Sequence, residues 1–154
     1  MPQIYRVMIK NADKPLIGNR ALMLGVRLPP SQGIIDIVPD NAGFVKPGTG
    51  GMSVSPDIGS LPKRLLPPGW LSPGDKSMSR SGNNTAVFSH GIGAFVVSRI
   101  GFNLRLVPDS MSHGLIEPST IMSVETFCNA LGNTVEDWQI VFPQEIIVET
   151  DGTK

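Results

Sequence analysis

The sequence contains very few of the residue types that build metal centres and disulfide frameworks. Its 154 residues include one cysteine and two histidines. This set forms neither a recognised zinc motif nor an internal disulfide, so we expect no metal site. A free thiol without a disulfide framework fits a reducing compartment, and we expect a cytoplasmic protein. Cys128 is interpreted as a small core residue, with a catalytic cysteine–histidine pair as the alternative.

Charge is also scarce, and it is balanced. Thirteen basic and thirteen acidic residues cancel, and only 17% of the residues are charged. No overall field therefore attracts nucleic acid or anionic lipid. The only loose basic cluster is interpreted as solvated loop charges. It consists of Lys63, Arg64, Lys76 and Arg80.

Long apolar runs are absent as well. Nowhere do about 18 apolar residues follow one another, as a membrane-spanning helix requires. The first residues, Met-Pro-Gln-Ile-Tyr-Arg-Val, lack the apolar segment of a signal peptide. We expect no membrane span, and no cleaved secretory peptide if the protein is delivered to another cell.

Short β-branched and apolar segments at both ends of the chain predict one α+β domain over residues 1–154. The main helix is expected at 124–131, capped by Ser123 and ended by a left-handed turn at Gly132 and Asn133. Thr134 is expected to cap one further turn. The predicted strands are 4–9, 34–38, 93–100, 103–107, 115–116, 139–142 and 145–149.

The middle of the sequence has a different composition. Almost half of residues 39–91 are glycine, proline or serine. Loops of such length are uncommon in compact domains unless they are functional or mobile. This stretch therefore either frames a ligand or is partly disordered, with short ordered pieces expected at 52–55 and 85–88.

Three short blocks could carry chemistry, although no phosphate loop or nucleophile elbow is present. Arg6 lies inside the first expected strand, and its planar guanidinium suits phosphates. Residues 48–55 combine paired glycines, which allow close backbone approach, with serine hydroxyls. Residues 113–118 place a histidine four residues before a glutamate. Taken singly, the blocks also fit a surface strand residue, a turn and a hydrogen-bonded loop histidine.

Together and in this order, the blocks resemble the ADP-ribosyltransferase-like toxins of bacterial type VI secretion. The matching segments are Ile-Tyr-Arg-Val-Met-Ile, Thr-Gly-Gly-Met-Ser-Val and His-Gly-Leu-Ile-Glu-Pro, the last followed by Met-Ser-Val-Glu-Thr-Phe. The resemblance runs from residue 4 to about residue 138, apart from the loop between residues 57 and 84. It implies a small split β-sandwich with one or two short C-terminal helices, which binds NAD between two antiparallel sheets.

The resemblance also implies roles for individual residues. Arg6 would hold the ribose or a phosphate of NAD, and Ser53 would support the nicotinamide half. His113 matches the histidine before the proline-ended strand, and Glu117 is the acid that would stabilise the oxocarbenium-like ribose. Arg6, Ser53, His113 and Glu117 form the expected catalytic set. The expected cofactor contacts are Tyr5, Arg6, Thr49, Gly50, Gly51 and Ser53.

These expectations define a function and two alternatives. The first hypothesis is an NAD-dependent ADP-ribosyltransferase-like toxin effector acting in a recipient cytoplasm, with a cognate immunity protein as partner and an unidentified macromolecular acceptor. If no acid faces the cleft, a catalytically degenerate binding module of the same fold is favoured. An RNA 2'-phosphotransferase-like enzyme would need several basic residues around the cleft, and only Arg6 is well placed by sequence.

Overall fold

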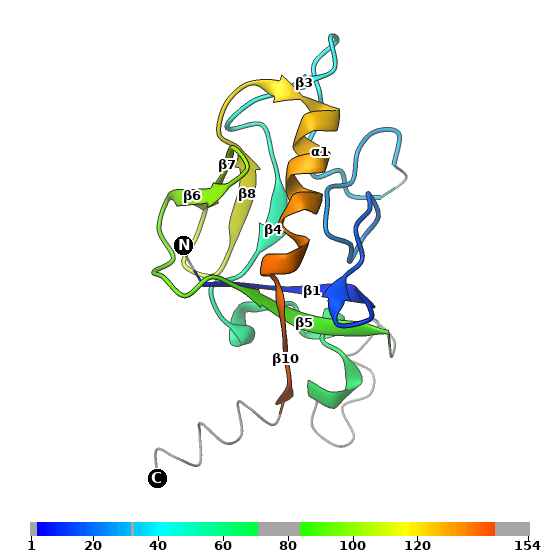
Figure 1. Ribbon diagram of the computed structural model, residues 1–154, viewed down its shortest axis with the longest axis vertical. Coiled ribbons are helices and arrows are strands. Elements are labelled where there is room, and N and C mark those ends of the chain that lie inside the picture. Colours follow the sequence, from blue (N-terminus) through cyan, green and yellow to red (C-terminus); the bar gives the residue numbers. More distant parts are fainter. Residues whose placement is uncertain (1–2, 32, 71–83, 144–154) are drawn as a thin grey trace.

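The computed structural model describes residues 3–31, 33–70 and 84–143. Within these ranges, short antiparallel strands dominate and are accompanied by one α-helix, an arrangement compatible with the predicted α+β class. Two four-stranded sheets carry most of the strands. In Figure 1, β1 and β5 run across the view, whereas β4 and β8 run along the long axis of the molecule.

The first sheet is built around the amino-terminal strand. β1 lies inside it, paired with β5 on one side and β2 on the other, which confirms that this strand is central. Its register joins Ile4 to His90 and Ile9 to Thr85. In sheet order the strands are β10 (Gln139–Val141), β5 (Thr85–His90), β1 (Ile4–Asn11) and β2 (Lys14–Pro15).

The second sheet consists of β4 and a meander formed by β6, β7 and β8. A separate short pair joins β3 (Phe44–Val45) to β9 (Met122–Ser123). In sheet order the strands are β4 (Met52–Val54), β8 (Gly114–Pro118), β7 (Leu104–Pro108) and β6 (Ser98–Gly101).

The helix α1 spans Val124–Asn133 and begins as predicted, because Ser123 Oγ accepts the N–H of Thr126. The predicted left-handed end is wrong. The helix continues through Gly132, which is buried against Ile17 and packs where a larger residue would crowd that side chain. Its C-cap is Thr134, in right-handed conformation, and the expected further turn is the 3-10 helix η5 (Val135–Asp137).

Thr134 does not cap η5 through its side chain. Its hydroxyl donates to Leu131 O at 2.7 Å and accepts Trp138 Nε1–H at 3.1 Å. The hydroxyl therefore links the helix end to a fully buried indole, and tertiary packing has replaced the expected local cap.

The expected strand at 34–38 is wrong. Only Ile37 forms an isolated bridge there, to Gly50, while Ile34, Ile35 and Val38 are exposed. Without a neighbouring strand, an apolar run cannot form a ladder, so local β propensity is overridden. The predicted strand at 93–100 is confined to β6, and the predicted strand at 145–149 lies outside the described residues.

The Gly/Pro/Ser-rich middle of the chain contains more local structure than its composition suggests. Both expected ordered pieces are present, as β4 and β5. Three 3-10 turns follow β4, namely η1 (Ile58–Ser60), η2 (Lys63–Leu65) and η3 (Pro68–Trp70). Leu61 and Leu66 from this segment are buried against Val7 and Val87, so it packs on the first sheet.

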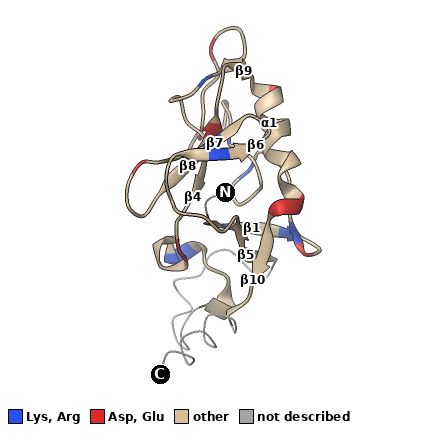
Figure 2. Ribbon diagram, turned by 60° about the vertical axis from the view of Figure 1, so that its left-hand side comes forward, with Lys and Arg blue, Asp and Glu red and all other residues tan. Residues whose placement is uncertain are grey.

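The main core lies between the two sheets and one side of α1. Met8, Phe88 and Ile116 come from the sheets, and Phe127 and Leu131 come from the helix; all are almost completely buried. No helix in the described ranges combines the length and apolar character needed to span a bilayer. Figure 2 shows basic and acidic residues scattered along the described chain rather than gathered on one element.

Candidate functional site

The candidate site lies where the two sheets meet. Tyr5 N–H donates to Ser55 O at 2.8 Å, and Ser55 N–H donates back to Tyr5 O at 3.0 Å. This pair of hydrogen bonds joins β1 to the residue that follows β4. The strands β1 and β4 themselves belong to different sheets. A cavity of about 300 Å³ opens beside the junction. Its polar and charged lining residues are Tyr5, Arg6, Arg27, Ser53, Ser55, Arg64 and His113.

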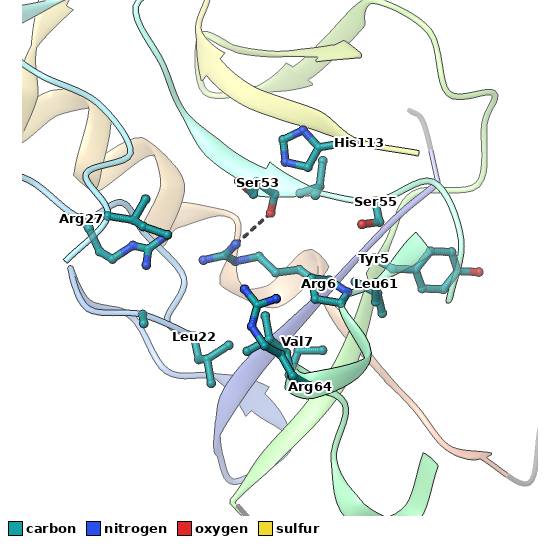
Figure 3. A pocket seen from close by; sticks show the side chains of 15 residues that line it. Tyr5, Arg6, Val7, Leu22, Arg27, Ser53, Ser55, Leu61, Arg64 and His113 are labelled. Carbon is teal, nitrogen blue, oxygen red and sulfur yellow. Dashed lines mark hydrogen bonds between the residues drawn. The ribbon is translucent and has the colours of Figure 1, made fainter. Parts of the chain in front are cut away.

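Strand register brings the serines and the histidine to one face. Ser53 lies opposite Leu115 and Val54 opposite Gly114, and Ser55 and His113 are the next residues beyond this ladder. Directly opposite residues point to the same side of an antiparallel sheet, and alternate residues along a strand share that side. Ser53, Ser55 and His113 therefore project together, and Figure 3 shows the His113 ring close to Ser53, at the rim of the cavity.

Arg6 approaches the same space from β1. Its Nη1 donates to Ser53 O at 2.8 Å (Figure 3). Its Nη2 donates to Met23 O at 3.0 Å. Its buried Nε has no hydrogen-bond partner among the described residues. Burial lowers the pKa of Arg6 to about 10, which Asp36 partly opposes and Arg27 reinforces. The guanidinium stays protonated at neutral pH, yet the hydrogen bonds that it makes are to neutral carbonyls.

The second arginine is paired. Arg27 donates through Nε and Nη2 to the two carboxylate oxygens of Asp36, both at 3.0 Å, and its backbone N–H donates to the same carboxylate at 2.7 Å. These hydrogen bonds raise the pKa of Arg27. Arg64, on η2, is an exposed third guanidinium at the cavity wall. None of the described residues that line the cavity is an aspartate or a glutamate.

Glu117 does not line this cavity. Its carboxylate is 4% exposed and bonds Arg105 on the adjacent strand, at 2.8 Å from Nε and 2.6 Å from Nη2. The N–H of Gly48 donates to the other carboxylate oxygen of Glu117, at 3.3 Å. Glu117 shares the sheet face of His113 but lies four residues further along β8, about 13 Å at the usual rise of a strand. The structure therefore places Glu117 apart from the cavity that Arg6, Ser53 and His113 line, in contrast to the single site that was expected.

The glycine block also lies outside the cavity lining. A Cβ on Gly50 would come within 2.2 Å of Asp36 O, and one on Gly51 within 2.2 Å of Ile116 O. Thr49 Oγ1 closes its own turn by donating to Lys46 O at 2.7 Å. These residues allow backbone segments to approach one another, and no ligand is needed to explain them. Their expected contacts with a cofactor are not supported by the geometry.

Tyr5 was expected to contact the cofactor, and Cys128 was expected to be a core residue. Tyr5 contributes to the cavity wall, but its ring points away from Arg6 (Figure 3). Cys128 lies on α1, partly buried against the core as predicted, and burial raises the pKa of its thiol. Its sulfur accepts a long hydrogen bond from Asn19 Nδ2 at 3.8 Å, and the cysteine does not line the cavity.

His113 has a charged partner that the sequence interpretation missed. Its Nδ1 lies 2.7 Å from Asp109 Oδ1. The turn between them is closed by backbone bonds from Asp109 N and Ser110 N to His113 O, at 3.0 and 3.2 Å. The histidine is thus held by both backbone and side chain at the edge of the cavity.

Arg27 and Arg64 were also missed as site residues. Arg64 was interpreted as a solvated loop charge, but the apolar residues on either side of it, Leu61 and Leu65, pack in the same wall. That apolar setting was visible in the sequence. The pairing of Arg27 with Asp36 depends on a loop without regular secondary structure, and no local signal indicated it.

No protein-family model matches this sequence, and no curated protein matches it at a significant level.

Proposed function

We propose that this cavity binds NAD and that the protein is an ADP-ribosyltransferase-like enzyme with a small split β-sandwich. The observation that carries the proposal is Arg6, a charged guanidinium with one unpaired buried nitrogen in a cavity that no described acid lines. A buried cation whose charge is compensated only in part, here by Asp36, is costly, so this site favours an anionic ligand. The diphosphate of a dinucleotide supplies two negative charges and planar pairs of oxygens that match guanidinium groups.

The location between two antiparallel sheets agrees with the cleft that the resemblance implies. A volume of about 300 Å³ is at the lower end of the range for small-molecule pockets. The cavity would hold the diphosphate and one ribose, while the rest of the dinucleotide would extend across the open rim beside His113. The acceptor is a macromolecule reached at this rim in a recipient cytoplasm, and a cognate immunity protein would block it.

The first test is calorimetric titration with NAD, with ADP-ribose and nicotinamide in parallel. We expect NAD and ADP-ribose to bind and nicotinamide alone to bind much more weakly, because the arginines of the cavity bind the diphosphate, which nicotinamide lacks. Release of nicotinamide from NAD then distinguishes an enzyme from a binding module. No binding of NAD at millimolar concentration would contradict the proposal.

A second candidate, an RNA 2'-phosphotransferase-like enzyme, is favoured by one specific observation. Such an enzyme needs several basic residues around its cleft, and Arg27, Arg64 and His113 line the cavity with Arg6. The test uses an RNA oligonucleotide with one internal 2'-phosphate, incubated with and without NAD. Loss of the phosphate only when NAD is present would favour this function over transfer to another acceptor.

A further inference from the structure

A transferase at this cavity requires a group that takes the proton of the attacking acceptor. Glu117 is committed to Arg105 and Gly48 outside the cavity. Among the described lining residues, His113 carries the side-chain type that exchanges protons near neutral pH. The following inference rests on the proposed function and concerns the chemistry of the same site.

We propose that His113 is the general base of this cavity and that Asp109 is the residue that positions it. With Nδ1–H donating to Asp109 Oδ1 at 2.7 Å, the neutral imidazole keeps its lone pair on Nε2. A carboxylate in this place fixes both the tautomer and the ring orientation, and it stabilises the imidazolium that forms when the base takes a proton.

The reaction step requires NAD, the acceptor and His113. The acceptor oxygen forms a bond to C1' of the nicotinamide ribose, and its proton moves to Nε2 of His113. The glycosidic bond between C1' and the pyridinium nitrogen breaks, and its electron pair leaves with neutral nicotinamide. The proton on the imidazolium is then lost to solvent. When water is the acceptor, the products are ADP-ribose and nicotinamide.

The exposure of the pair fits this role. The side chain of His113 is 40% exposed and that of Asp109 is 51% exposed. A macromolecular acceptor or water can therefore reach the imidazole from outside while the buried Arg6 holds the anionic part of the substrate within. In Figure 3, His113 and Arg6 lie on opposite sides of Ser53, and all three residues line the same cavity.

The other explanation is that Asp109 only closes a surface turn. That turn has two backbone hydrogen bonds of its own, from Asp109 N and Ser110 N to His113 O. Asp109→Asn should therefore retain the turn and the fold while it changes the partner of Nδ1. A purely structural role predicts a change in stability and no change in tautomer or pH profile.

The first measurement is the tautomer of His113, read from ¹H–¹⁵N correlations of the imidazole rings. The assignment is practical because the chain has only one other histidine, the buried His90. We expect the Nδ1–H form in the wild type at pH 7.5, and a mixture or the Nε2–H form in Asp109→Asn. A wild-type His113 protonated on Nε2 would overturn the inference, whether or not NAD binds.

The second measurement is nicotinamide release from NAD by the full chain. His113→Gln should lower kcat on the order of a hundredfold or more, the usual contribution of a general base, with little change in NAD affinity. Asp109→Asn should lower kcat by less and change its pH dependence. Asp40→Asn is the matched control, because Asp40 is an exposed turn aspartate whose carboxylate accepts the backbone N–H groups of Ala42 and Phe44 and does not line the cavity.

The outcomes separate the inference from the proposed function. NAD binding with undiminished nicotinamide release by His113→Gln would overturn the base assignment and leave NAD binding intact. A wild type that does not bind NAD would contradict the proposed function and the base assignment with it. An equal fall in kcat for Asp109→Asn and Asp40→Asn would remove Asp109 from the mechanism.

Discussion

The two ends of the same face of the β4–β8 sheet are built in opposite ways. At one end, Glu117 and Arg105 form a cross-strand ion pair, and the N–H of Gly48 donates a hydrogen bond to Glu117. At the other end, Arg6 and His113 line a cavity, and a buried nitrogen of Arg6 has no partner within the described part of the chain. The closed end pairs its carboxylate directly with an arginine, whereas the buried guanidinium of Arg6 at the open end bonds two carbonyls and has Asp36 as a partial counter-charge.

This difference shows that the presence of a carboxylate in a motif does not place it in a site. Glu117 and His113 belong to one six-residue segment and project from the same side of their strand. The loop carrying Gly48 covers one of them and leaves the other at the cavity rim.

Gly51→Ala should have the largest effect, on stability. A Cβ there would lie 2.2 Å from Ile116 O and 3.2 Å from Glu117 Cα, and backbone atoms cannot move aside as a flexible side chain can. We expect a loss of about 3 kcal/mol in the free energy of unfolding, measured by urea denaturation. Gly33→Ala, with nothing within 4 Å, is the control and should be close to neutral. If Gly51→Ala is as stable as the wild type but does not bind NAD, Gly51 belongs to the ligand site and its role is not close backbone packing.

Arg6→Ala should weaken NAD binding by about 1.5–3 kcal/mol, or roughly tenfold to a hundredfold in Kd, because a charge-assisted contact is lost. Calorimetry measures the change. Arg99→Ala removes an exposed arginine from β6 and should leave Kd unchanged. Equal effects of the two substitutions would mean that the open end has no special anion site.

Glu117→Gln should lower stability by about 1–3 kcal/mol, because Arg105 loses its carboxylate partner and Gly48 loses an anionic acceptor. Arg105 is 37% exposed, so water relieves part of the cost. Nicotinamide release per folded molecule should be unchanged. A fall in kcat at unchanged stability would show that Glu117 takes part in catalysis. The two ends of the sheet face would then not differ in function.

His90, which does not line the cavity, isolates the cost of an unpaired buried nitrogen. Both ring nitrogens are buried without a partner among the described residues, and the ring packs on Trp138 at 5.1 Å between centroids. Burial lowers the pKa of His90, which the charge of Asp137 partly opposes. The folded state therefore keeps this imidazole neutral, while the unfolded state takes up a proton near pH 6.5.

The unfolded state consequently binds more protons below that pH, and stability falls as the pH decreases. The slope from His90 is at most about 1.4 kcal/mol per pH unit. Thermal unfolding between pH 7.5 and 5.5 should show this loss in the wild type and a smaller one in His90→Phe, which keeps an aromatic contact with Trp138. Identical pH profiles would show that His90 already has a partner, such as a buried water.

The short elements with strong local signals were predictable. The first strand contains three β-branched residues and one aromatic residue, and α1 begins at a serine whose side chain caps it. The end of α1 and the segment at 34–38 were mispredicted because neighbours decide them. Gly132 continues a helix since it packs against Ile17, and the 34–38 run finds no strand to pair with.

The sequence by itself determined that this protein is rich in short strands, carries balanced charge and places Arg6, Ser53 and His113 on ordered segments. These properties depend on composition and on contacts between near neighbours. Tertiary structure alone decided that Arg27 and Arg64 join them at one cavity, and that Glu117 is closed off by Arg105 and Gly48. The reason is physical: a side chain's partner is set by which strands pair and which loop covers them, and these long-range contacts leave no periodic signal in the chain.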